Sequence, residues 1–279
     1  MRIDVMKTYK LFINGQFPRS ESGRVYELKD FKGKFLANPA LGSRKDLRDC
    51  VVSSRAAFPG WSSATAYNRG QILYRIAEIM EGRSEQFISE LTSQEGLSAS
   101  AAKIEVQKAI DLWVWYAGWT DKISALSGSN NPVAAPFYNF SSSEALGVVA
   151  VFADGKPSLL SLVAGVAPVI TSGNVAILVA NEKFPLSSVT LAEVLATSDL
   201  PAGVINVITG KAEELAPWVG SHMDIDGVDA TGLPKKLLKE LEIAGAENLK
   251  RIHTFDSLKS PNRILGFTEL KTVWHPIGI

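Results

Sequence analysis

The chain has 279 residues, of which 46% are apolar and 21% are charged, and its 29 basic and 29 acidic side chains give a net charge of zero. This composition is typical of a globular protein and excludes a collagen-like fibre, a coiled coil and a long disordered tract. Proteins that bind duplex nucleic acid usually carry a basic excess, which this chain lacks. We therefore expect no nucleic-acid partner.

The cysteine content restricts both chemistry and compartment. Cys50 is the single cysteine of the chain, so an internal disulfide framework and a four-thiolate zinc site are both excluded. One unpaired thiol suits a reducing environment, and we expect a cytoplasmic protein.

No segment has the pattern of a signal peptide or a membrane span. Residues 1–10 contain charged side chains and no apolar run. The most apolar stretch, residues 159–180, is interrupted by Gly165, Pro168 and Gly173, whereas a membrane helix needs about 20 mostly apolar residues. We therefore expect no membrane association.

The first half of the chain has the pattern of an extended leader followed by helices. Asn14-Gly15 between apolar flanks predicts a hairpin turn. Ser43 is suited to cap a helix that ends near Phe58, because Pro59 and Gly60 follow. Apolar residues at helical spacing predict further helices over residues 68–81, 85–94 and 98–125.

The last of these helices is rich in aromatic residues, namely Trp113, Trp115, Tyr116 and Trp119. Such a set can form a platform on which nucleic-acid bases stack. Because the helix carries no matching basic stripe, packing in the core or in an interface is the better interpretation.

In the second half, apolar runs alternate with helical patterns. The runs over residues 146–152, 175–180, 204–208, 225–230 and 249–255 have the composition of buried strands. Helical patterns lie between them, including residues 186–197, 212–219 and 233–244. This alternation predicts βαβ units and a parallel sheet, whose ligands bind at the carboxyl ends of the strands.

The residues that follow these strands are therefore the first candidates for a site. They include Asp154, Gly155, Lys156, Asn181, Glu182, Gly210, Thr231, Gly232 and Asp256. No G-x-G-x-x-G fingerprint occurs among them. Gly155-Lys156 is a poor match to a phosphate loop, because Pro157 stands where Ser or Thr should follow the lysine.

The sequence motifs give little support for a metal site or for a serine nucleophile. His222, His253 and His275 lack the spacing of paired ligands, and we predict no metal site. The segment His222-x-Asp224-x-Asp226 is better interpreted as a polar turn before a strand. No G-x-S-x-G elbow is present for a serine nucleophile.

Several stretches of the chain resemble the aldehyde dehydrogenase superfamily in their order and spacing. In the second half these are Glu144-Ala-Leu-Gly-Val-Val, Ser172-Gly-Asn, Pro201-Ala-Gly-Val-Ile-Asn-Val, Ala244-Gly-Ala-Glu-Asn-Leu-Lys-Arg and Lys259-Ser-Pro-Asn. In the first half these are Leu11-Phe-Ile-Asn-Gly, Asn38-Pro, Ala66-Tyr-Asn-Arg-Gly-Gln-Ile-Leu and Tyr116-Ala-Gly-Trp-Thr-Asp-Lys. The resemblance extends from about Leu11 to Asn262.

The resemblance implies an α/β fold with a Rossmann-like parallel sheet and flanking helices. Residues 1–143 would form an N-terminal helical region with the first part of an oligomerisation hairpin, and residues 144–262 a coenzyme-type domain. Residues 263–279 would form a C-terminal oligomerisation strand, which in the family completes the sheet of a partner. This arrangement resembles the second module of two-module aldehyde dehydrogenases.

The resemblance also shows what this chain lacks. Between Asn262 and Phe267 the family has its whole catalytic domain, which carries the cysteine nucleophile that attacks the aldehyde. Cys50 lies far upstream of that position, so we predict no catalytic residue and no aldehyde oxidation by this chain alone.

Other positions depart from the family's pattern. Lys156 stands where the family has the Asn that stabilises the oxyanion, and Val179 stands where it has the Lys that binds the adenosine ribose. Phe255 replaces the general base, and Ser257 and Leu258 replace glycines beside the nicotinamide. The pyrophosphate-binding Gly-Ser pair becomes Gly232-Leu233, followed by Pro234, while the acid at Glu182 is kept. We name Lys156, Glu182, Gly210 and Gly232 as candidate cofactor-binding residues.

Three functions follow from these observations. The first is a non-catalytic structural or regulatory subunit that requires no cofactor and forms a homo-oligomer, or a hetero-oligomer with a full-length aldehyde dehydrogenase. The second is an NAD- or NADP-binding module with a weakened nucleotide site. The third is an enzyme of another kind, in which the Lys156 amine at a helix N-terminus forms a Schiff base.

Overall fold

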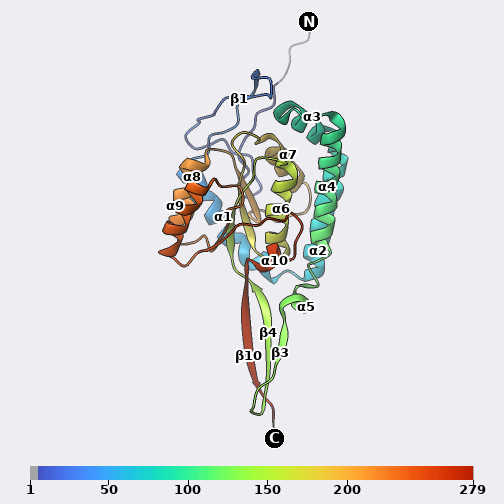
Figure 1. The fold of residues 1–279 in the computed structure, drawn as a ribbon, viewed down its shortest axis with the longest axis vertical. Coiled ribbons are helices and arrows are strands. Elements are labelled where there is room, and N and C mark those ends of the chain that lie inside the picture. Colours follow the sequence, from blue (N-terminus) through green and yellow to red (C-terminus); the bar gives the residue numbers. More distant parts are fainter. Residues whose placement is uncertain (1–5, 279) are drawn as a thin grey trace.

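The computed structural model describes residues 6–278, and its centre is a five-stranded parallel sheet (Figure 1). Its strands are β5 (Val148–Phe152), β6 (Val175–Val179), β7 (Ile205–Ile208), β8 (Gly227–Asp229) and β9 (Arg251–His253). They are arranged in the order β7-β6-β5-β8-β9, and every neighbouring pair is parallel. The predicted Rossmann-like parallel sheet with flanking helices is thereby confirmed.

Helices cover both faces of this sheet because its inner strands are apolar on both sides. All residues of β5, β6 and β7 are buried. The helices that connect the strands are α6 (Ser158–Thr171), α7 (Leu186–Leu195), α8 (Ala212–Ser221) and α9 (Lys235–Ala246). In α6 only Leu160 escapes full burial, since this helix lies between the sheet and an outer helical layer.

The N-terminal helices form that outer layer and also cover one face of the sheet. They are α1 (Arg44–Ser63), α2 (Ala66–Gly82), α3 (Ser84–Glu95), α4 (Ala99–Ala117) and the short α5 (Ile123–Ser127). Helix α1 packs against β6 and β7, whereas α4 packs against α2 and α6. In α4, Trp113 and Tyr116 are fully buried, so these aromatic residues belong to the core.

Two helix boundaries differ from the sequence prediction. Helix α1 continues through Pro59 to Ser63, because buried Trp61 anchors its last turn by donating from Nε1 to the Ile170 carbonyl at 3.0 Å. The single helix predicted over residues 98–125 is instead two helices, since α4 ends at Ala117 and Gly118 caps it.

The leader is attached to the sheet by backbone hydrogen bonds. Phe12 and Val207 exchange two of them, at 2.9 and 2.7 Å, which places the leader antiparallel to β7. The predicted turn is present, with Asn14 at φ 51° and Gly15 at φ 72° between the paired Ile13 and Gln16. A small antiparallel pair, β1 (Leu28–Lys29) and β2 (Phe35–Ala37), follows.

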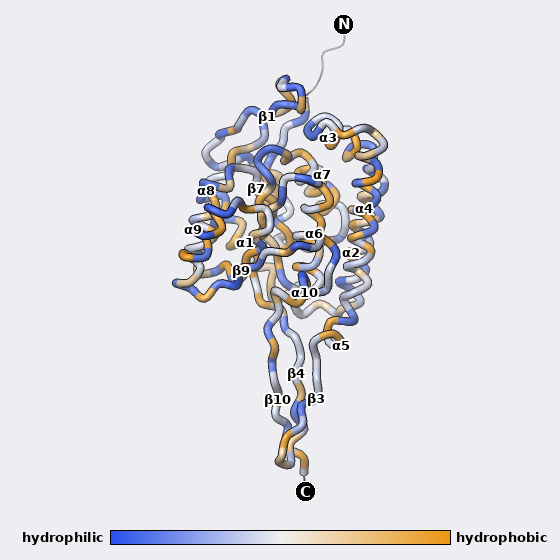
Figure 2. The backbone as a smooth tube through the Cα atoms, in the orientation of Figure 1, coloured by the Kyte–Doolittle hydropathy of each residue, from blue (hydrophilic) through white to orange (hydrophobic). Residues whose placement is uncertain are grey.

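A second, antiparallel sheet projects from the body (Figure 1). It contains β3 (Ser129–Asn131), β4 (Phe137–Ala145) and β10 (Thr268–Pro276) in the order β10-β4-β3. Strand β10 pairs with β4 along its whole length, from Thr268 opposite Ala145 to Pro276 opposite Phe137. Figure 2 shows hydrophobic segments at the tip of this projection, near the C-terminal end.

The helix α10 (Asn262–Leu265) lies in the segment that joins β9 to β10. No helix within residues 6–278 combines the length and apolarity needed to cross a bilayer.

Candidate functional site

A cleft of about 640 Å³ lies beyond the carboxyl ends of the central strands. Its walls come from the ends of β5 and β6 and the segments after β5, β6, β7 and β8, namely residues 152–155, 179–184, 211–213, 232–234 and 237. Glu182 and Gly232, two of the four predicted cofactor-binding residues, line it. This position is where open parallel sheets bind their ligands, so the cleft is the candidate site.

Gly232 is required by a close approach of two backbones. A Cβ atom built on Gly232 would lie 2.4 Å from the carbonyl of Ala153 and 2.5 Å from that of Phe152. The Gly232 N–H donates to the Phe152 carbonyl at 3.2 Å, which fixes the loop after β8 against the end of β5. A glycine therefore stands here because no side chain fits, and the same approach shapes the floor of the cleft.

Glu182 stands on the exposed wall of the cleft, in the turn after β6. The turn is stabilised by the Asn181 carboxamide oxygen, which accepts from the Lys183 N–H at 3.0 Å. A carboxylate in this position can accept hydrogen bonds from sugar hydroxyl groups. The aliphatic Val179 at the end of β6 is 2% exposed and offers no such bond, so one sugar contact expected in the family is missing.

The N-terminus of α9 opens into the same cleft. Its N-cap residue is Pro234, and no side chain caps the helix. The unbonded N–H groups of the first turn are suited to donate to the phosphates of a nucleotide. The residues present thus fit a dinucleotide in part: Glu182 would hold a sugar and the α9 N-terminus a pyrophosphate, without the serine hydroxyl that Leu233 replaces.

Lys156 is directed away from this cleft. Its Nζ donates to the Glu95 carbonyl at 3.2 Å, at the last residue of α3, and lies 5.0 Å from the centre of the Phe184 ring. A lysine that binds the final carbonyls of a helix stabilises that helix end. The structure therefore gives the Lys156 ammonium a packing role and does not place it with Gly232.

Gly210 is also outside the cleft lining. It follows β7 with φ 153°, and a Cβ atom there would lie 3.3 Å from the backbone of Gly42. The Gly42 N–H donates to the neighbouring Thr209 carbonyl at 2.8 Å. Gly210 thus allows the leader to approach the end of β7.

The N-terminus of α6, beside the cleft, is occupied by carboxylates of this chain. Glu105 accepts from the N–H groups of Leu159 and Leu160 at 2.9 and 3.3 Å, and Ser158 hydrogen-bonds to Glu95. Burial raises the pKa of both glutamates. The α6 N–H groups that would otherwise attract an anion are therefore already used.

Phe255, which the resemblance places at the general-base position, and Cys50, the single cysteine, are both packing residues. The Phe255 ring lies against the guanidinium of Arg263, at 4.7 Å, and against the rings of His253 and Phe267. Cys50 is fully buried in α1 and does not line the cleft, and burial raises the pKa of its thiol. A buried thiol with a raised pKa is a poor nucleophile.

Residues of the polar turn before β8 form ion pairs and hydrogen bonds within the fold. Asp226 pairs with Arg55 at 2.7 Å and accepts from the Val148 N–H at 2.7 Å, while the Asp224 N–H donates to His222 Nδ1 at 3.2 Å. Within residues 6–278, no group of three or more His, Cys, Asp or Glu side chains is arranged to hold a metal ion.

Sequence reasoning did not single out Lys183, Lys211 and Glu213, which also line the cleft. Lys183 follows β6 and the other two follow β7, so their position beyond a strand end was the available signal.

An open parallel sheet with a ligand cleft beyond its strands, joined to a projecting antiparallel sheet, defines an α/β protein of the Rossmann-like class. The model of the aldehyde dehydrogenase family matches residues 17–275. The chain therefore belongs to the aldehyde dehydrogenase family.

The similar proteins are about twice as long as this chain. An aldehyde dehydrogenase of Emericella nidulans is 29% identical over 273 residues, which cover 96% of this chain and 54% of the relative. Omega-crystallin of Enteroctopus dofleini is 30% identical over 270 residues, with 95% and 54% covered. Retinal dehydrogenase 2 of Homo sapiens is 30% identical over 273 residues, with 95% and 52% covered. The chain thus spans about half the length of these relatives.

Solved structures have the same fold. Betaine aldehyde dehydrogenase from Staphylococcus aureus, in complex with NAD+, superimposes with a TM-score of 0.83 at 22% identity, covering 88% of this chain and 49% of that one. The NAD+ complex of aldehyde dehydrogenase from Bacillus cereus gives a TM-score of 0.81 at 24% identity, covering 88% and 50%.

Proposed function

We propose that this protein does not oxidise aldehydes by itself and serves as a structural or regulatory subunit. It self-associates or pairs with a full-length aldehyde dehydrogenase. The observation that carries this proposal is the direct connection between β9 and β10: residues 254–267 lead from one sheet to the other, where the family has its catalytic domain.

The chemistry of the cleft supports the absence of activity. Aldehyde oxidation by the family's covalent route needs an activated thiolate, and Cys50 is buried away from the cleft. Phe255 at the general-base position has no group that can take a proton. Loss of acid–base assistance alone lowers rates by about 10²–10⁴-fold.

The projecting sheet supports association. Leu270 and Trp274 of β10 are 59% and 58% exposed, and Ile277 beyond it is 52% exposed. Strand β10 lies at an edge of its sheet. An edge strand with exposed apolar side chains needs pairing or covering, which a second subunit would supply.

The experiment is a measurement of molar mass by light scattering after size-exclusion chromatography, for the chain alone and after co-expression with a full-length aldehyde dehydrogenase of the same host. We expect a dimer or larger assembly in one of the two samples, and its loss in the Leu270→Glu/Trp274→Glu variant. Val52→Glu, at an exposed position of α1, is the control. A monomer in both samples would contradict the proposal.

A second candidate function, nucleotide binding, is favoured by Glu182 and by the uncapped α9 N-terminus in one cleft. The test is isothermal titration with NAD and NADP. A dissociation constant below ~10 μM, equivalent to about −7 kcal/mol, would support it. The single unpaired cysteine supports a cytoplasmic location for either function.

A further inference from the structure

The leader encloses a second pocket, which shares no lining residue with the cleft. Its lining comes from residues 6–10, 19, 20, 23–25, 35, 37, 38 and 40, and its volume is about 370 Å³. We call it the leader pocket. Backbone hydrogen bonds join its walls: Leu11 N–H to Pro18, Ala40 N–H to Tyr9 and Leu41 N–H to Arg24, at 3.1, 3.0 and 2.9 Å. The pocket is therefore formed by paired segments whose positions are fixed.

The lining of this pocket carries positive charge only. Its cationic residues are Lys7, Lys10, Arg19 and Arg24, and no Asp or Glu is among its lining residues. Lys7 is neutralised by Glu193, at 3.0 Å. The other three cations have no ion-pair partner within the described part of the chain.

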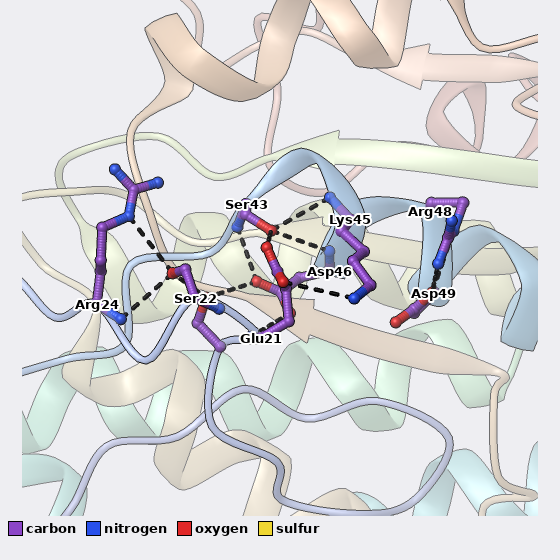
Figure 3. Close-up of polar contacts among 9 residues, drawn as sticks. Glu21, Ser22, Arg24, Ser43, Lys45, Asp46, Arg48 and Asp49 are labelled. Atoms are coloured by element: carbon purple, nitrogen blue, oxygen red, sulfur yellow. Dashed lines mark hydrogen bonds and ion pairs between the residues drawn. The ribbon is translucent and has the colours of Figure 1, made fainter.

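The carboxylates near the pocket are bound to other groups, and two of them, Glu90 and Glu193, contact Lys7 at 3.8 and 3.0 Å. Asp46 accepts from the Ser20 hydroxyl at 2.7 Å and from the Glu21 N–H at 3.0 Å. The Glu21 carboxylate pairs with Lys45 at 3.5 Å. Figure 3 shows the Arg24 guanidinium apart from both carboxylates, with its Nε bonded only to the Ser22 hydroxyl, at 3.4 Å. Among residues 6–278, Lys10, Arg19 and Arg24 are thus left without a paired carboxylate.

We infer that the leader pocket binds a small multivalent oxyanion, namely a phosphate group, free or carried on a small molecule. Two guanidinium groups offer the paired N–H donors that match phosphate oxygens, and Lys10 adds a point charge. Asn38 and the Tyr9 hydroxyl, whose pKa burial raises, supply neutral donors in the same lining. Neither the family's catalytic chemistry nor the proposed subunit role requires this site.

The test is calorimetric titration of the full chain with pyrophosphate and, separately, with inorganic phosphate. We expect binding of pyrophosphate with a dissociation constant below about 1 mM, equivalent to about −4 kcal/mol, and weaker binding of phosphate. Arg19→Ala/Arg24→Ala should weaken binding at least ~10-fold, since both sets of charge-assisted guanidinium donors are lost. Arg19→Lys/Arg24→Lys should recover part of that loss, because the charge is kept.

Two controls separate this pocket from other cationic surfaces. Lys32→Ala/Lys34→Ala removes cations of the leader outside the pocket, and Lys235→Ala/Lys236→Ala removes those at the α9 N-terminus. Both should bind pyrophosphate within twofold of the parent chain. Circular dichroism of each variant verifies that it is folded. Absence of binding to the parent chain, or a loss confined to the Lys235/Lys236 variant, would overturn the inference.

Discussion

The guanidinium of Arg263 contacts the carboxylate of Asp229 at 2.9 Å, and both side chains are only 2% exposed. Asp229 ends β8, and Arg263 lies on α10, in the segment that joins β9 to β10. Arg263 also donates to the carbonyls of Ala164 and Ser257, at 3.1 and 2.6 Å. This pair therefore fastens the short connection to the carboxyl edge of the sheet.

Removing one partner of this pair should destabilise the fold strongly. We expect Arg263→Ala to lower the free energy of unfolding by about 3–5 kcal/mol, because it leaves Asp229 buried and uncompensated. Arg251→Ala breaks the more exposed pair with Glu269 and should cost below about 1 kcal/mol. Urea unfolding measures both. Equal losses in the two variants would show that the Arg263 pair has no special role.

A second prediction follows from the close approach of Gly232 to the backbone of Ala153. Gly232→Ala forces a methyl group onto the Ala153 carbonyl and should cost about 1–3 kcal/mol. Gly60→Ala, in the interior of α1 with nothing within 4 Å of the added Cβ, should instead stabilise by about 0.5–1 kcal/mol. Thermal unfolding distinguishes the two variants, because the unfolding temperature should fall in Gly232→Ala and rise in Gly60→Ala. A stable Gly232→Ala protein would mean that the cleft floor is loosely packed.

Much of this fold could be predicted from the sequence, because its signals are local. Continuous apolar runs identify β5 and β6, and Asn14-Gly15 identifies the leader turn. The continuation of α1 past Pro59 could not be predicted, since it depends on Trp61 reaching a carbonyl more than a hundred residues away.

The candidate site was predictable only in part, because local sequence signals do not report long-range contacts. Position beyond a strand indicated Glu182 and Gly232, both of which line the cleft. The same rule indicated Lys156 and Gly210, which do not line the cleft. The Lys156 side chain is held by the Glu95 carbonyl, and Gly210 packs against the backbone of Gly42. The Arg263–Asp229 pair joins residues far apart in sequence and gives no local signal.

Glu90 should make stability depend on pH. Burial raises its pKa to about 7, although Thr190 and Lys7 oppose that rise, and Glu193 adds to it. Because an unfolded Glu titrates near 4.5, the stability that Glu90 contributes is fully present below that pH and is lost as the pH rises through about 7.

The measurement is urea unfolding of the parent chain and of the Glu90→Gln variant from pH 6 to pH 8. Relative to the variant, the parent chain should lose about 1 kcal/mol over this range. Glu85→Gln, in the first turn of the same helix α3, is the matched control. A difference in unfolding free energy between the parent chain and Glu90→Gln that does not change with pH would contradict the assigned titration.

The thiol of Cys50 should be unreactive while the protein is folded. It is fully buried, and burial raises its pKa, so the thiolate that reacts with disulfide reagents is scarce. We expect labelling by a chromogenic disulfide to be complete in concentrated guanidinium chloride and to proceed in buffer only at the rate of unfolding. Fast stoichiometric labelling of the native chain would place the thiol at an accessible surface.

The most direct measurement is the reduction of NAD and NADP by the purified chain with a panel of aliphatic and aromatic aldehydes. The Cys50→Ala variant, prepared in the same way, reports any contaminating host enzyme. We predict that both proteins give the rate of the enzyme-free blank, because no accessible thiol meets the cleft within the described residues. Turnover by the parent chain that disappears in Cys50→Ala would contradict the proposed non-catalytic role.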